Sequence, residues 1–237
     1  MDRYFPALAL CTAFFELAAA TWVFRSPGRA NVLRPTGLIL IFLAGYQLLE
    51  AYACGNPSMT LVGRLALADV IWLPPLGVWL IIQLAAPDDG LFRRFGKGLF
   101  GIAGGLAAFI LLDDQFVRRT VCQAVIATYH TPGPVYMFYG GFYQFGLMAM
   151  IFGAAKGMIR SDDPSVRRHL GDIQMGTIGF VLPALITEVV VPQSSTSTPS
   201  VMCHFAVVLA VFLVRMTVRE RRIAADGMTA PIRTCQV

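Results

Sequence analysis

The apolar segment from Gly37 to Cys54 constrains this chain more than any other stretch. It is close to the roughly 20 residues that a helix needs to cross a bilayer, yet it carries a carboxylic acid, Glu50, near one end. An ionisable group inside a membrane is costly, so it is expected to face protein or a water-filled cavity and to have a function. We therefore expect the other helices to be arranged around Glu50.

The composition places the rest of the chain in a membrane as well. Of 237 residues, 56% are hydrophobic and only 14% are charged, and the mean hydropathy is +0.64. Soluble domains carry about 25% charged residues. Only helices and closed barrels span membranes, and the lengths of the apolar runs favour an all-α bundle of seven transmembrane helices. The predicted spans are 4–24, 37–54, 65–86, 98–112, 134–155, 170–191 and 200–218.

Proline, glycine and basic residues refine this plan. Pro74-Pro75 is expected to break the third span, and the fourth is short and rich in glycine. All but four of the 19 Lys and Arg fall on one side of the spans. Basic loops face the cytoplasm, so we expect a lumenal or extracellular N-terminus and a cytoplasmic C-terminus. Residues 1–218 then form one transmembrane domain, followed by a short basic cytoplasmic tail over 219–237.

The same distribution of charge bears on partners and location. The basic residues lie in loops between spans, so the net charge of +5 is no argument for nucleic acid. The N-terminal apolar run contains Glu16 and lacks a clear cleavage site, so it is expected to be retained as a helix. The chain is predicted to be an integral multi-pass protein of the endoplasmic reticulum if fungal, or of the plasma membrane if bacterial. Protein partners are not predicted.

Polar residues from separate segments are expected at one depth on the lumenal side. They are Glu50, Asp69, Glu188 and His204 near the outer ends of four spans, with His130 in the long loop over 113–133. We interpret them as a lumen-side polar pocket. Each also has a plain structural reading. Glu50 would be an interhelical hydrogen-bonding group, Asp69 and Glu188 would be solvated at the interface, His204 would pack and His130 would be exposed. Glu16, deeper in the first span, is expected to make a separate interhelical contact.

Four aromatic residues and the loop histidine are candidates for binding a substrate in this pocket, namely Tyr46, Trp72, Tyr139, Tyr143 and His130. Tyr139 and Tyr143 are four residues apart and so share one face of a helix. Aromatic faces stabilise positive charge, which would suit a developing carbocation. The alternative is that these side chains form the aromatic belt found at membrane interfaces.

The cysteines and the absence of known motifs narrow the possible covalent links and cofactors. Cys54, Cys122 and Cys203 are all predicted on the lumenal side, where a disulfide can form, but the sequence does not select the pair. The last span has no lysine for a retinal Schiff base, and there is no P-loop, dinucleotide fingerprint or zinc-protease motif. No cofactor and no metal are expected.

Three short segments resemble the small seven-helix terpene cyclases of fungal secondary metabolism. In the second span of that family a glycine is followed thirteen residues later by a catalytic glutamate and then by Pro-Ser. The matching positions here are Gly37, Glu50, Pro57 and Ser58. The segment from Arg64 to Pro87, with Trp72, is similar to the following span. Glu188 precedes Pro192-Gln193 as a glutamate does in the sixth span. The family carries an aspartate in its last span, whereas here His204 is the only ionisable residue in the outer half.

The resemblance implies acid/base opening of an epoxide on a lipophilic polyene or prenylated substrate, by cyclisation or hydrolysis, without a cofactor. Glu50 would protonate the epoxide oxygen, and Asp69 or Glu188 would accept a proton. The chain also resembles uncharacterised bacterial seven-helix proteins and the seven-helix sensor regions of bacterial histidine kinases. These imply the alternative of a sensor or complex subunit that binds a ligand or metal in the same pocket.

Overall fold

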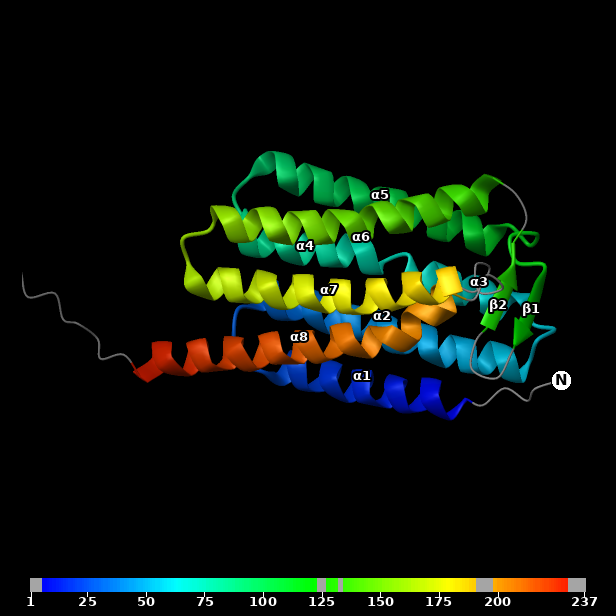
Figure 1. The fold of residues 1–237 in the computed structure, drawn as a ribbon, viewed down its shortest axis with the longest axis horizontal. Helices are drawn as coiled ribbons and strands as arrows, with labels where there is room; N and C mark the ends of the chain where they lie inside the picture. The colour runs from blue at the N-terminus through cyan, green and yellow to red at the C-terminus, as the bar shows by residue number, and fades with distance from the viewer. Residues whose placement is uncertain (1–5, 123–126, 132–133, 191–197, 230–237) are drawn as a thin grey trace, which may run out of the picture.

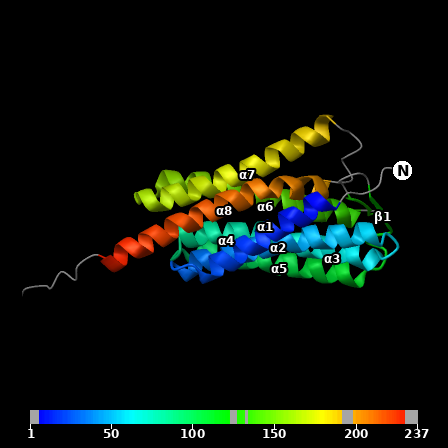
Figure 2. The ribbon, with the colours of Figure 1, turned by 90° about the horizontal axis from the view of Figure 1, so that it is seen from below.

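The helices of the computed structural model run side by side along one long axis, with a small β-hairpin at one end (Figures 1 and 2). The structure describes residues 6–122, 127–131, 134–190 and 198–229. The helices are α1 (Ala7–Arg25), α2 (Ala30–Gly55), α3 (Thr60–Val70), α4 (Leu73–Ala85), α5 (Gly90–Leu112), α6 (Pro134–Arg160), α7 (Pro164–Val190) and α8 (Thr198–Thr229). The strands are β1 (Arg119–Cys122) and β2 (Ala127–His130). We call the end with the strands the hairpin end and the opposite end, where α8 finishes, the tail end.

The outer surface of the bundle is apolar. Large side chains such as Phe14 (71% exposed), Phe152 (68%) and Ile159 (86%) lie on it, where a water-soluble protein rarely has large apolar patches. In the described part of the chain, seven helical segments are long and apolar enough to cross a membrane, counting α3 and α4 together. The chain is a multi-pass membrane protein, and the predicted helical bundle is confirmed.

Several helices extend beyond the predicted spans. The fourth was expected over 98–112, but α5 begins at Gly90 because the carboxylate of Asp89 accepts hydrogen bonds from the amides of Leu91 and Phe92. Likewise α8 continues to Thr229, so the first part of the expected tail is helical. Hydropathy detects only the apolar part of a helix, whereas caps and tertiary contacts determine where it starts and ends.

The expected break in the third span lies just before the two prolines. α3 ends at Val70 and α4 begins at Leu73, which puts Pro74 and Pro75 in the first turn of α4. Proline is tolerated there because the first amides of a helix have no partner within it. The break separates Asp69, at the end of α3, from the apolar face of α4.

The loop expected over 113–133 contains an antiparallel hairpin, in which Arg119 pairs with His130 and Cys122 with Ala127. A disulfide joins Cys122 to Cys54 near the end of α2, with 5.6 Å between the Cα atoms. This identifies the disulfide partners that the sequence did not select. Cys203 is a buried free thiol. The hairpin is therefore attached covalently to the helix that carries Glu50.

The contact between α6 and α4 depends on one glycine. A Cβ atom added at Gly146 would lie 2.3 Å from the Cβ of Pro74, which belongs to a rigid ring. We expect Gly146→Ala to destabilise the protein by about 1–3 kcal/mol through this overlap, measured as a lower thermal unfolding temperature in detergent. Gly140→Ala on the same helix meets nothing within 4 Å and should be neutral or stabilising, since alanine favours a helix by about 1 kcal/mol. Equal effects of the two substitutions would contradict this account.

Candidate functional site

Glu50 lies inside the bundle and is 0% exposed. Its helix, α2, packs against α1, α3, α4 and α8, so a side chain on its inner face is surrounded by protein. Tyr46, one turn earlier, and Gln47 are also fully buried. The side-chain amide of Gln47 donates a hydrogen bond of 2.7 Å to the carbonyl oxygen of Cys203, which holds α2 against the start of α8. Glu50 therefore faces protein and not the lipid headgroups.

Two further acids share this region with Glu50. The carboxyls of Glu16, Glu50 and Asp69 all act electrostatically on the thiol of Cys203. The side chain of Asp69 lies against the backbone of α2, and its Oδ1 would be 2.8 Å from a Cβ atom added at Gly45. Glycine at this position lets an acid on α3 approach α2 one turn before Glu50. We call Glu16, Glu50 and Asp69 the acid cluster.

Glu16 was expected to make a separate contact, deeper than the other acids. It comes from the middle of α1 and is 0% exposed, and neither of its carboxyl oxygens has a hydrogen-bond partner among the described residues. Within the same residues, neither Glu16 nor Asp69 forms an ion pair with a cation. Glu16 belongs to the acid cluster because α1 packs against α2 and α8. This packing was not predicted from the sequence.

Three of the four predicted aromatic residues are near the acid cluster. Tyr46 and Tyr143 both interact electrostatically with Cys203. The hydroxyl of Tyr139 donates a 3.2 Å hydrogen bond to the carbonyl oxygen of Leu67, two residues before Asp69. Trp72 instead packs on α5, with its ring centroid 6.4 Å from that of Phe100.

A fourth tyrosine near the acid cluster, Tyr129, comes from the segment that was expected to be a loop over 113–133. It belongs to β2, is 2% exposed and acts electrostatically on Tyr46. A Cβ atom added at Gly63 would lie 3.1 Å from its ring, so the hairpin packs closely on α3. Residues 113–133 were expected to form a loop, so the strand that buries this tyrosine was not predicted.

The remaining predicted site residues are less central. His130 is exposed at the end of β2, and His204 is half-buried one residue after Cys203. Glu188 belongs to α7, but the structure does not describe its side chain. Pro192 and Gln193 are not among the described residues. In the part of the chain that the structure describes, no three His, Cys, Asp or Glu side chains gather closely enough to hold a metal ion.

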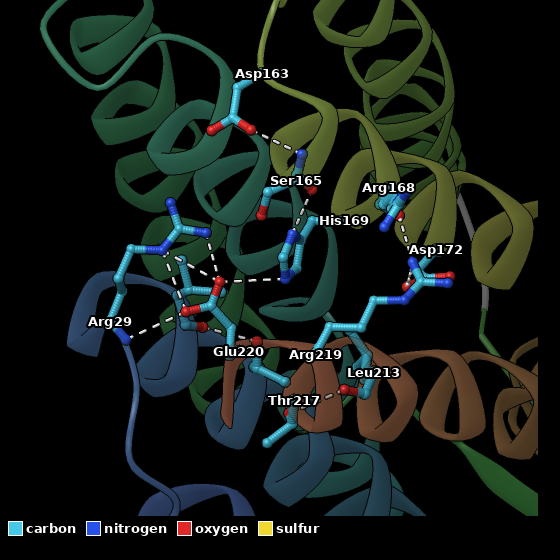
Figure 3. A network of polar contacts seen from close by, with 12 residues as sticks. Arg29, Asp163, Ser165, Arg168, His169, Asp172, Leu213, Thr217, Arg219 and Glu220 are labelled. Atoms are coloured by element: carbon cyan, nitrogen blue, oxygen red, sulfur yellow. Dashed lines mark hydrogen bonds and ion pairs between the residues drawn. The ribbon is translucent and has the colours of Figure 1, made fainter. Parts of the chain in front are cut away.

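A second polar cluster, which the sequence analysis missed, lies at the tail end (Figure 3). Glu220 and His169 are each 1% exposed, and the Nε2 atom of His169 is 3.2 Å from a Glu220 oxygen. Arg29 also pairs with Glu220 and donates to it through its side chain and its backbone amide. The hydrogen bond that Arg29 donates to Glu220 raises the pKa of the Arg29 guanidinium. This network, Arg29–Glu220–His169, joins the connection between α1 and α2 to α7 and α8.

A neighbouring pair adds to the same junction. The guanidinium of Arg219 donates to a carboxylate oxygen of Asp172 at 2.6 Å and to the carbonyl oxygen of Arg168 at 3.1 Å. The network was missed because residues 219–237 were expected to form a solvated tail. The signal for it in the sequence was an acid, Glu220, placed between Arg219 and Arg221.

We expect Glu220→Gln to destabilise the protein by about 1–3 kcal/mol, the usual cost of leaving buried polar groups without a charged partner. The substitution keeps the shape of the side chain and removes the charge that faces Arg29 and His169. Thermal unfolding in detergent measures the loss. Asp162→Asn removes an exposed carboxylate and should leave the unfolding temperature unchanged. If the two variants unfold alike, the network contributes nothing to stability.

The comparisons with known proteins are negative. No protein-family model matches the chain, and neither does any curated protein. The function therefore has to be inferred from the chemistry of the acid cluster.

Proposed function

We propose that the chain is a membrane-integral acid/base enzyme that opens an epoxide of a lipophilic polyene or prenylated substrate. The observation that carries this proposal is that Glu16, Glu50 and Asp69, from three helices, all lie within electrostatic range of the Cys203 thiol inside an apolar bundle. Taking a carboxylate out of water is expensive, so a carboxyl buried in apolar surroundings tends to keep its proton. A protonated carboxyl is a general acid, and no cofactor is needed for this reaction.

In the proposed reaction Glu50 transfers its proton to the epoxide oxygen as one carbon–oxygen bond of the ring breaks. The carbon that becomes electron-poor is attacked by water in hydrolysis, or by an internal hydroxyl in cyclisation. Asp69, half-buried and so closer to water than Glu50, takes the proton that the attacking group loses. Two carboxyls in different environments can serve as acid and base in this way.

The buried aromatic residues support the same chemistry. Tyr46, Tyr139 and Tyr143 are all buried beside the cluster, and the faces of aromatic rings stabilise nearby positive charge. They would bind the prenyl chain, and their ring faces would stabilise the electron-poor carbon more than they stabilise the neutral epoxide. Apolar surroundings also suit a substrate that arrives from the bilayer.

We also propose that the hairpin end faces the lumen or the outside. The excess of Lys and Arg at the tail end supports this orientation through the positive-inside rule. The disulfide between Cys54 and Cys122 supports it independently, because disulfides persist in oxidising compartments. The substrate would then react in the outer half of the bilayer.

The test is to incubate the purified protein in lipid vesicles with an epoxide of farnesyl acetate and with an epoxide of a prenylated phenol, in water enriched in ¹⁸O. We expect the epoxide to be consumed. A diol with one ¹⁸O atom identifies hydrolysis, and an unlabelled cyclic ether identifies attack by the phenol hydroxyl. Saturable binding with no consumption of either epoxide would overturn the proposal and favour the alternative, a seven-helix sensor.

A further inference from the structure

An apolar slot lies far from the acid cluster, at the tail end between α4, α5 and α6. Its volume is about 180 Å³. Most of its lining is aliphatic or aromatic, including Val78, Ile82, Phe92, Phe95 and Ala149. Phe95 is 41% exposed on the outer surface of the bundle, so the slot adjoins the region occupied by lipid.

Two basic side chains lie at one end of this slot. Lys156 and Arg160, one turn apart on α6, both line it and are exposed. The ammonium of Lys156 lies 5.4 Å from the centre of the Phe92 ring, a cation–π contact that keeps it at the rim. Neither cation forms an ion pair with a described residue.

One acid also lines the slot but leaves the rim positive. The carboxylate of Asp89 accepts hydrogen bonds from the amides of Leu91 and Phe92 and caps α5. The positive end of the helix dipole offsets its charge. The rim thus presents two cations that form no ion pair with a described residue, next to an apolar channel.

A glycine on α6 keeps part of the slot open. A Cβ atom added at Gly153 would be 3.6 Å from the Cγ2 of Ile81, which is ordinary van der Waals contact. A larger side chain at this position would extend into the slot without displacing backbone. Gly153 therefore allows the slot to be filled by substitution.

We propose that this slot binds one acyl chain of an anionic phospholipid, with the lipid phosphate on Lys156 and Arg160. The charge of the rim matches the phosphate, and the apolar lining matches the chain. Basic side chains at the membrane surface attract anionic headgroups generally, and here the chain adds a specific contact. A zwitterionic lipid would place a cationic group beside the same two cations and bind more weakly.

The test measures lipid binding to the full chain in a neutral detergent by native mass spectrometry. Dioleoylphosphatidylglycerol should bind about tenfold more tightly than dioleoylphosphatidylcholine. Lys156→Gln should remove that preference, whereas Lys97→Gln, the same change at an exposed site outside the slot lining, should keep it. Gly153→Leu should weaken binding of both lipids, and Gly141→Leu, at an exposed position with nothing within 4 Å, should not.

Three outcomes would overturn the proposal. They are equal affinity for the two lipids, equal effects of Lys156→Gln and Lys97→Gln, and competition by glycerol phosphate as strong as by the whole lipid. The last would identify a site for free phosphate and remove the role of the acyl chain. If the Gly153 variant does not fold, the two charge variants still decide the question.

Discussion

Replacing Glu50 with glutamine is expected to lower the turnover of a lipophilic epoxide by about 100-fold or more, the contribution typical of a general acid. Glutamine has nearly the same size, so the buried helix face around Tyr46 and Gln47 should be retained. It has no acidic proton, so the epoxide oxygen would leave as an unprotonated alkoxide. The initial rate of epoxide consumption in vesicles measures the effect.

A loss of turnover is informative only if the variant is inserted and folded. Thermal unfolding checks the fold, and Asp162→Asn, which removes an exposed carboxylate far along the sequence, serves as the matched control with full activity. Unchanged turnover in Glu50→Gln would rule out the acid role of this residue. Glu50→Asp should retain part of the activity, since it keeps a proton donor in a shorter side chain.

The role of Asp69 can be separated from that of Glu50 by the dependence of rate on pH. A general base must be ionised, so the wild-type rate should fall on the acid side of its optimum as the base becomes protonated. Asp69→Asn should lower the rate and flatten this acid-side fall. If the profile of the variant keeps the wild-type shape, another group is the base.

Removal of the disulfide is the second large effect. The double variant Cys54→Ser, Cys122→Ser is expected to lose about 2–4 kcal/mol of stability, the usual contribution of a disulfide. The bridge closes a loop with a sequence separation of 68, and it keeps the hairpin on α3, where Tyr129 packs against Gly63. Thermal unfolding with and without a reducing agent measures the loss.

Two controls make this prediction specific. Cys11→Ser changes a free, exposed cysteine and should leave the unfolding temperature unchanged. A reducing agent should lower the unfolding temperature of the wild type and of Cys11→Ser but not of the double variant. If the wild type is insensitive to reduction, the bridge does not support the hairpin.

The predicted helical plan was largely right because each span is encoded locally. An apolar run of about 20 residues must be helical in a bilayer, and Pro74-Pro75 marks the break in the third span. The hairpin was not predicted, because its strands are short and lie outside the apolar runs. The ends of α5 and α8 were also wrong, since a cap at Asp89 and a tertiary contact at Glu220 extend them beyond the hydropathy signal.

The candidate site was predicted only in part. Glu50 could be identified because a carboxylic acid in an apolar span is costly, and its neighbours Tyr46 and Gln47 follow from the helical period. Glu16 could not be assigned to it, since its distance from Glu50 depends on how α1 packs. Trp72 was assigned to the site by its place in the chain, but packing turns it toward α5.

The sequence by itself determined that the chain crosses a membrane on seven apolar segments, and that Glu50 must face inward. Both results depend on transfer free energies of residues that are close in the chain. The tertiary structure alone decided the pairing of Cys54 with Cys122, the placement of Glu16, Glu50 and Asp69 within electrostatic range of Cys203, and the network at Glu220. These depend on contacts between segments far apart in the chain, and neither hydropathy nor periodicity carries information about such distances.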